Sequence, residues 1–176
     1  MKVLITGGAG YLGTVLTEEI LNRFPYAKVI VYDNLMYKQD GLFSFFKYPK
    51  DRFEFVYGDV RDKNSLLEQL QKLDKNNDYV IPLAAIVGFP ACARDEKLAT
   101  AVNFEHVKYI VQSTKCRIIY PNTNSGYGVS DGEAHCTEET PLAPISVYGK
   151  TKCDAEEWVL GAGHTSLRLA TVFGTS

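Results

Sequence analysis

Near its N-terminus the chain reads Val3-Leu-Ile-Thr-Gly-Gly-Ala-Gly-Tyr-Leu-Gly13. A short apolar run, closely spaced glycines and an amphipathic stretch from Tyr11 to Phe24 form the pattern of a strand, a tight turn and a helix. Glycines without Cβ let the backbone approach a pyrophosphate, whose charge the free N–H groups and the dipole at the helix start would meet. The stretch therefore predicts a dinucleotide-binding turn whose contacts are Gly7, Gly10, Tyr11, Leu12 and Gly13.

A second apolar run, Lys28 to Tyr32, ends in Asp33, twenty residues after Gly13. A carboxylate at this place can accept both ribose hydroxyls of an adenosine, and it would repel a 2′-phosphate. The expected cofactor is therefore NAD rather than NADP, with Asp33 and Asn34 at its adenosine end. The alternative for Asp33 is an ordinary turn residue at the end of a strand.

The composition is that of a globular protein, and 176 residues are enough for one domain with its own core. A net charge of −2 without a basic run argues against nucleic acid or an anionic membrane surface as a partner. No apolar stretch approaches the length of a membrane span, and a cytoplasmic protein is expected. The cysteines are scattered and have no His at ligand spacing, so we expect reduced thiols and no metal site. They are Cys92, Cys116, Cys136 and Cys153.

Beyond Asp33, apolar strand-like runs alternate with helical patterns, which favours a doubly wound parallel α/β sheet with helices on both faces. The further strands are expected at 53–57, from 79, at 117–120 and near 167, and the helices at 64–72, 93–115 and 148–160. Residues 34–52 are expected to form an irregular connection with one short helix. Its aromatic residues, Phe43, Phe45, Phe46 and Tyr48, are expected to pack on the sheet edge.

Ligands of doubly wound sheets lie beyond the carboxyl ends of the strands, so the residues that follow each strand are candidates. Asp59 and Val60 follow the third strand and could reach an adenine edge, although Asp62 or Asn64 fits a helix N-cap better than Asp59 does. The fourth strand exits through small residues that let the backbone lie against a flat cofactor, namely Leu83, Ala84 and Ala85.

We expect two polar residues in the helical pattern that follows to face different surroundings. Asn103 could turn inward towards the cofactor side of the sheet. His106, between Glu105 and Lys108, is expected to face solvent.

The fifth strand is followed by hydroxyl and amide side chains where substrate and nicotinamide should meet. They include Thr123, Asn124 and Ser125. Tyr148 and Lys152 come later and, being four apart, share one helix face. A tyrosine with its usual pKa near 10 is a poor base at neutral pH, but a neighbouring ammonium favours the phenolate. Thr123, Tyr148 and Lys152 are therefore the candidate catalytic residues.

With these motifs in view, the chain resembles the extended short-chain dehydrogenase/reductases, in particular the NAD-dependent nucleotide-sugar epimerase/dehydratase family. The matching runs are 6–13, 33–35, 58–62, 83–85, Asn103, Thr123 before Tyr127-Gly128, 144–152 and 167–174.

The resemblance implies that Tyr148 is the catalytic acid/base, that Lys152 lowers its pKa and holds the nicotinamide ribose, and that Thr123 hydrogen-bonds the reacting sugar hydroxyl. Hydride would pass between a sugar carbon and the nicotinamide, with a keto-sugar as intermediate. The implied substrate is a nucleotide-diphosphate sugar, and the implied assembly is a homodimer through the helices near 93–115 and 148–160.

The chain also departs from the family pattern. Pro82 stands where the family usually has His, and Thr171 stands where it often has Asn. The dehydratases carry an Asp-Glu pair where this chain has Asn124-Ser125, and neither residue can act as a carboxylate acid or base. Epimerisation or keto reduction is therefore expected rather than dehydration. A cysteine acid/base is not seen at the matching position, although Cys92 stays open.

The family continues beyond the position of Ser176 into a smaller region that grips the nucleotide sugar. We expect residues 1–176 to be an NAD-binding Rossmann-type domain, the N-terminal part of a longer nucleotide-sugar epimerase with its C-terminal substrate region missing. The alternatives are a reductase or a 4,6-dehydratase of the same family, or a non-catalytic NAD-binding module.

Overall fold

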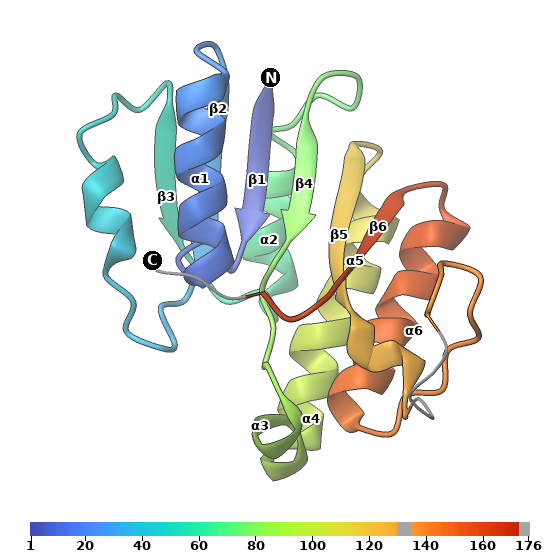
Figure 1. The fold of residues 1–176 in the computed structure, drawn as a ribbon. Coiled ribbons are helices and arrows are strands. Elements are labelled where there is room, and N and C mark those ends of the chain that lie inside the picture. The colour runs from blue at the N-terminus through green and yellow to red at the C-terminus, as the bar shows by residue number, and fades with distance from the viewer. Residues whose placement is uncertain (130–134, 173–176) are drawn as a thin grey trace.

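Six strands form one parallel sheet in the order β3-β2-β1-β4-β5-β6 in the computed structural model, which describes residues 1–129 and 135–172 (Figure 1). They are β1 Lys2–Thr6, β2 Lys28–Asp33, β3 Phe53–Tyr57, β4 Tyr79–Pro82, β5 Arg117–Thr123 and β6 Thr165–Leu169. The strand order reverses between β1 and β4, which places a crevice at the carboxyl ends of these strands. The predicted Rossmann-type fold is confirmed. Of the motif at 167–174, Phe173 and Gly174 lie outside the described residues.

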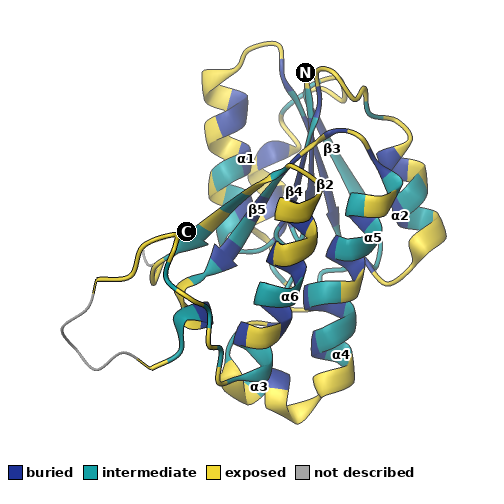
Figure 2. Cartoon of the chain, turned by 90° about the vertical axis from the view of Figure 1, so that its right-hand side faces the viewer, coloured by how far each residue is buried: buried dark blue, intermediate teal, exposed yellow. Residues whose placement is uncertain are grey.

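Helices cover both faces of the sheet, as predicted. The 13-residue helix α1, Tyr11–Arg23, lies on one face with the short 3-10 helix η1, Gly41–Phe45. The other face carries α2 Lys63–Leu70, α4 Glu96–Thr100, α5 His106–Ser113 and α6 Val147–Gly161. Neighbouring residues of β1 point to opposite faces, so that Ile5 packs with the α1 side and Leu4 with the α5 side. Figure 2 shows the central strands as the buried layer between the helices, whereas the edge strand β6 has no buried residue.

The β1–α1 turn adopts its shape because its glycines have no side chain. Gly7 has φ +69°, and its N–H donates to Tyr32 O at 2.9 Å. A Cβ on Gly7 would collide with the backbone of Ala84, which follows β4. A Cβ on Gly13 would collide with the backbone of Gly8. The turn therefore lies closely against the exit of β4.

The sheet opens towards the cleft between β4 and β5. These strands pair only at Tyr79 with Arg117 and at Val80 with Ile118. The pairing of β5 with β6 begins at Ile119 and continues to Thr123. Because β5 leaves β4 halfway along, the carboxyl ends of the two strands stand apart and leave room between them.

The prediction of one continuous helix over 93–115 is wrong. Helix α3, Phe89–Arg94, ends at Asp95, whose carboxylate accepts from Leu98 N at 2.9 Å and caps α4. A π-helical segment, η2 Ala101–Glu105, then joins α4 to α5. The hydrophobic pattern cannot distinguish α-helical from π-helical turns, but Asp95 was an available N-cap signal.

The other helix predictions are closer. Asp62 caps α2 by accepting from Asn64 N and Ser65 N, both at 3.1 Å. The aromatic residues of the 34–52 connection differ in exposure. Phe45 is buried, and the centre of its ring lies 5.5 Å from that of Phe53. Phe43 is 72% exposed and Phe46 is 56% exposed. The prediction that all four pack on the sheet edge is therefore wrong for Phe43, whereas the Phe46 ring lies 5.9 Å from that of Phe53 on the edge strand β3. In the described part of the chain, no helix has the length and apolar character needed to cross a membrane.

His106 is buried, not solvated as expected. It begins α5 on the face that packs against the sheet, while Glu105 lies on the exposed side. Its Nε2 lies 3.5 Å from Thr6 Oγ1, and burial lowers the pKa of its imidazole to about 4. A charged flanking residue shows only that an adjacent face is solvated, because successive helix residues are about 100° apart.

We predict that Gly7→Ala destabilises the fold, because it adds both a steric collision with the backbone of Ala84 and an unfavourable positive φ. The free energy of unfolding should fall by at least about 2 kcal/mol in urea titrations. The matched control is Gly161→Ala in α6, where a Cβ meets nothing within 4 Å. This control should leave stability unchanged or raise it, and equal losses in the two variants would contradict the close approach at Gly7.

Because His106 is buried, we predict that the protein loses stability in mild acid. Its pKa is about 4 in the fold against 6.5 for the free side chain, so the unfolded chain binds more protons between these values. Stability should fall by about 1 kcal/mol from pH 7 to pH 5.5 through this residue. Urea titrations of His106→Gln should show a shallower dependence. His164→Gln is the control, because burial lowers the pKa of His164 in the same direction although that side chain is less enclosed; an equal effect of both changes would contradict the assignment to His106.

Candidate active site

One cleft of about 560 Å³ runs along the carboxyl ends of the strands. Every site residue that the sequence predicted lines it: Gly7, Gly10, Tyr11, Leu12, Gly13, Asp33, Asn34, Asp59, Val60, Leu83, Ala84, Ala85, Thr123, Asn124, Ser125, Tyr148 and Lys152. The structure thus brings together residues from five strand ends and two helices. The role that each residue can play depends on the geometry at its end of the cleft.

Asp33 ties the end of β2 to the glycine turn. Its Oδ2 accepts from Ala9 N at 3.0 Å, and its Oδ1 accepts from Leu35 N at 2.7 Å. Each carboxylate oxygen has two lone pairs, so both keep a free acceptor position on the cleft side. The carboxylate can therefore receive two hydroxyl donors without giving up its backbone contacts.

Asp59, on the neighbouring strand end, is engaged by protein groups. Arg61 donates to both of its oxygens, at 2.9 and 2.7 Å, and Asn34 Nδ2 donates at 3.1 Å. The hydrogen bond from Arg61 is the main reason that the pKa of Asp59 falls to about 2. The carboxylate orders the loops after β2 and β3, and an adenine contact of Asp59 and Val60 stays a prediction.

Asn103 turns inward, as predicted, but its side chain does not line the cleft. It is buried, its Oδ1 accepts from Ile86 N at 2.8 Å, and its Nδ2 donates to Ile86 O at 3.0 Å. The same amide group lies 3.3 Å from Thr151 Oγ1 on α6. Asn103 therefore fixes the exit of β4 to α6 and acts on the cleft through Ile86, which lines it.

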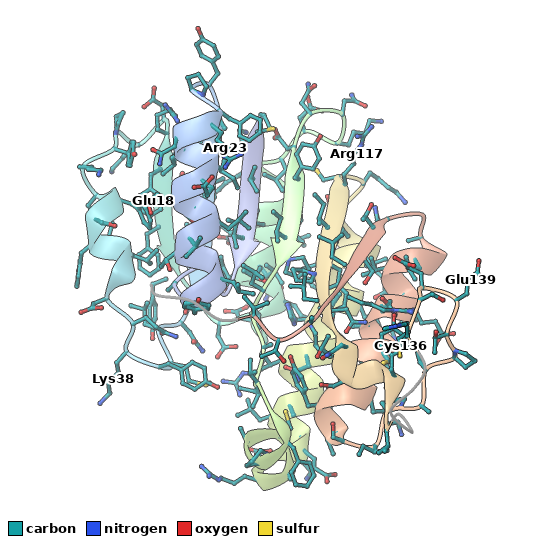
Figure 3. The ribbon with its side chains drawn as sticks, in the orientation of Figure 1. Glu18, Arg23, Lys38, Arg117, Cys136 and Glu139 are labelled. Carbon is teal, nitrogen blue, oxygen red and sulfur yellow. The ribbon has the colours of Figure 1, made fainter. Side chains whose placement is uncertain are left out.

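Cys92 is sealed below this exit. Its side chain is fully buried, and its Sγ donates to Ile86 O at 3.1 Å. Burial raises the pKa of the thiol. A thiol that is held protonated away from the cleft cannot serve as a second acid/base, which closes the possibility left open by the sequence. Cys136, by contrast, lies at the surface near Glu139 (Figure 3).

The opposite end of the cleft holds the three candidate catalytic residues. Tyr148 and Lys152 face it from α6, and Thr123 is the last residue of β5. Lys152 is 5% exposed; its Nζ donates to Pro121 O at 2.7 Å and lies 4.1 Å from the centre of the Tyr120 ring. Burial lowers the pKa of Lys152 to about 7. An ammonium is thus placed where a small change of environment alters its charge.

The phenol and the hydroxyl beside it are also constrained. Burial raises the pKa of Tyr148, and the neighbouring Thr123 hydroxyl acts in the opposite direction. Thr123 Oγ1 accepts from Ser125 N at 3.2 Å and donates to Ser125 Oγ at 3.1 Å, which fixes its rotamer at the rim of the cleft. The lowering of the pKa of Tyr148 by Lys152 stays a prediction.

The sequence missed several lining residues. Leu169, the last residue of β6, and residues 170–172 after it could have been found from the rule that ligands lie beyond strand ends, because the chain there passes the carboxyl ends of β5 and β4 (Figure 1). Met36, Tyr37 and Gln39 come from the loop after β2, where Leu35 and Lys38 have φ of 53° and 54°. Such left-handed conformations at non-glycine residues carry no sequence signal. The Lys38 side chain itself points outward (Figure 3).

The known proteins that this chain resembles include epimerases and dehydratases. The profile of the NAD dependent epimerase/dehydratase family matches residues 3–176. CDP-paratose 2-epimerase from Salmonella typhi is 29% identical over 180 residues, 91% of this chain and 52% of the relative. The chain spans about half the length of the curated relatives that it matches.

Solved structures with NAD bound are similar over nearly the whole chain. UDP-glucuronic acid 4-epimerase from Bacillus cereus superposes with a TM-score of 0.85 at 26% identity, over 99% of this chain and 57% of that one. dTDP-glucose 4,6-dehydratase from Streptomyces venezuelae superposes with a TM-score of 0.82 at 26% identity, over 94% of this chain and 54% of that one.

The cleft fits NAD on its own chemistry. The N-cap of α1 is Gly10, and no side chain caps this helix start, so its N–H groups can meet a pyrophosphate. The free acceptor positions of Asp33 suit a ribose with both hydroxyls, and its charge opposes a 2′-phosphate. The glycine turn, Asp33 and the small residues after β4 can therefore hold the cofactor.

Proposed function

The chain belongs to the NAD dependent epimerase/dehydratase family, and on this premise we propose that it carries the cofactor site and the proton-transfer residues of a nucleotide-sugar epimerase. The observation that supports this most strongly is the convergence of Thr123, Tyr148 and Lys152 on the cleft that also contains the glycine turn and Asp33. NAD, when bound, supplies the hydride acceptor. The substrate in this proposal is a nucleotide-diphosphate sugar, which is oxidised to a keto-sugar and reduced again.

In this proposal the protein moves one proton at one sugar oxygen. Thr123 holds the reacting hydroxyl by a hydrogen bond, and Tyr148 takes its proton as the carbon is oxidised. Lys152 holds the nicotinamide ribose, and its positive charge favours the phenolate form of Tyr148. Tyr148 returns the proton when the keto-sugar is reduced from its other face, which inverts the carbon.

The acidic side chains of the cleft favour epimerisation over dehydration. The lining carboxylates among the described residues are Asp33 and Asp59, at the ends of β2 and β3. Asn124 and Ser125, beside the candidate catalytic residues, have no carboxyl group. Elimination of water needs a proton acceptor at the neighbouring carbon, and no carboxylate next to Thr123 offers one in the part of the chain described.

A homodimer is a further part of the proposal. The outer surface of α5 and α6 carries Trp158, whose ring lies 4.5 Å from Lys108 Nζ, and Leu160, which is 48% exposed. Aromatic side chains are enriched where protein surfaces meet, and the partly exposed Trp158 is the feature that supports this surface. We also propose a cytoplasmic location, because the four cysteines are free thiols.

We predict that Asp33→Ala raises the Kd of NAD, because the adenosine ribose loses its carboxylate acceptor. The increase should be at least about tenfold by isothermal titration calorimetry. Asp40→Ala is the control, since Asp40 lies on the same connection with an exposed side chain that caps nothing. An unchanged Kd in folded Asp33→Ala would remove Asp33 from the cofactor site.

Tyr148→Phe tests the chemistry. The variant should bind NAD with unchanged affinity, because only a hydroxyl at the reacting end is lost, while turnover of nucleotide sugars should fall by roughly a hundredfold or more. The assay uses the protein as isolated from its source and a panel of nucleoside-diphosphate sugars, with loss of configuration followed by NMR. Tyr109→Phe is the control, since Tyr109 donates to Lys63 O on the surface. Substantial turnover in Tyr148→Phe would exclude Tyr148 as the acid/base.

A further inference from the structure

A buried ion pair lies behind the candidate catalytic helix. Glu156 on α6 is 2% exposed, and Arg168 on β6 donates to it through Nε at 3.1 and 3.0 Å, with Nη2 2.9 Å from Oε2. Ser166 Oγ donates to the same carboxylate at 2.6 Å. A carboxylate in an apolar interior needs such donors, because burial alone disfavours its charged form.

The hydrogen bonds keep Glu156 ionised. Burial would raise its pKa, but the donors from Arg168 and Ser166 outweigh this effect and lower it. Arg168 is fixed from its other side as well, since its Nη1 donates to Tyr127 Oη at 3.2 Å and to Glu138 O at 3.0 Å. The carboxylate is therefore held ionised at one place in the core, paired with the Arg168 guanidinium.

Glu156 follows Lys152 by four residues, so the two side chains share the inward face of α6. Both are buried, and the hydrogen bond of the Lys152 ammonium goes to Pro121 O, so the carboxylate acts on it through space. The charge of Glu156 raises the pKa of Lys152 against the larger lowering by burial.

The other titratable groups that face Lys152 are uncharged at neutral pH. Tyr148 and Cys153 share its helix, Tyr120 lies below it on β5, and His106 faces it from α5. Burial raises the pKa of both tyrosines and of the thiol, and it lowers that of His106 to about 4. A charged Cys153 would also raise the pKa of Lys152, but burial keeps this thiol protonated at neutral pH, so the negative charge that acts on Lys152 is that of Glu156.

We propose that Glu156, held by Arg168, is a positioning residue that keeps the buried Lys152 ammonium charged at the cofactor cleft. The proposal rests on the proposed function in its use of Lys152 but assigns a new role to the ion pair. Without the carboxylate, burial would favour the neutral amine, which has no positive charge to support a phenolate at Tyr148. Strand β6 thereby contributes to the site through an interaction made behind it.

The direct test is the titration of Lys152 itself, followed by NMR of its ε-methylene group in ¹³C-lysine-labelled protein. The resonance is assigned by its loss in Lys152→Gln. In Glu156→Gln the midpoint should fall by about one pH unit, because one buried negative charge is removed. Glu157→Gln is the matched control, since Glu157 is the next residue of the helix and is exposed. Its midpoint should equal that of the unmodified protein.

Glu156→Gln leaves Arg168 buried without its partner and so threatens the fold. The double variant Glu156→Gln/Arg168→Met removes both charges and should lower the midpoint of Lys152 by a smaller amount, because the loss of the Arg168 charge acts in the opposite direction. Ser166→Ala removes one hydrogen bond but keeps the carboxylate, and it should leave the midpoint in place. An unchanged Lys152 midpoint in either folded Glu156 variant overturns the proposal.

The pH dependence of NAD binding separates this inference from the proposed function. If Lys152 contacts the cofactor, the alkaline loss of NAD affinity should move to lower pH in Glu156→Gln and not in Glu157→Gln. A shifted Lys152 midpoint with an unshifted NAD profile would refute the cofactor contact of Lys152 while supporting the role of Glu156. An unshifted midpoint would refute the role of Glu156 whatever the NAD profile shows.

Discussion

The close approach of the β1–α1 turn to the exit of β4 is the constraint on which the rest of the structure depends. The backbone at Gly7 lies against Ala84 with no room for a side chain, and Asp33 accepts from Ala9 N in the same turn. Three strand ends are thereby fixed against one another at the point where the strand order reverses. Because no side chain caps the start of α1, its N–H groups remain accessible to an anion.

The two ends of the cleft differ in electrostatic character. At the end formed by β2 and β3, partly exposed carboxylates of Asp33 and Asp59 are held by backbone N–H groups and Arg61. At the other end, Tyr148 and Lys152 are desolvated, so their charge states respond strongly to nearby groups. The first end suits recognition of hydroxyl groups, and the second suits proton transfer.

Much of the fold could be predicted from the sequence, because the strand, glycine and helix signals around residues 3–33 are local. Most of the predicted lining residues followed from one rule about strand ends, and Tyr148 and Lys152 followed from their spacing on one helix face. The surroundings of Asn103 and His106 could not be predicted in this way. The π-helical segment Ala101–Glu105 contains Asn103 and directly precedes His106, and an α-helical period does not describe the directions of side chains there. The loop after β2 was also beyond prediction, because the left-handed conformations of Leu35 and Lys38 depend on tertiary contacts rather than residue type.

The ion pair behind α6 shows why a site cannot be read from its lining residues alone. Glu156 and Arg168 come from different elements, and neither lines the cleft. Yet burial of Lys152 opposes its charge, and a desolvated ammonium needs a compensating negative charge within range. The side chains that face it from α5 and β5 are neutral, so the compensation comes from the next turn of its own helix. In this proposal, the position of β6, which supplies Arg168, bears on the proton transfer proposed for Tyr148 as well as on the edge of the sheet.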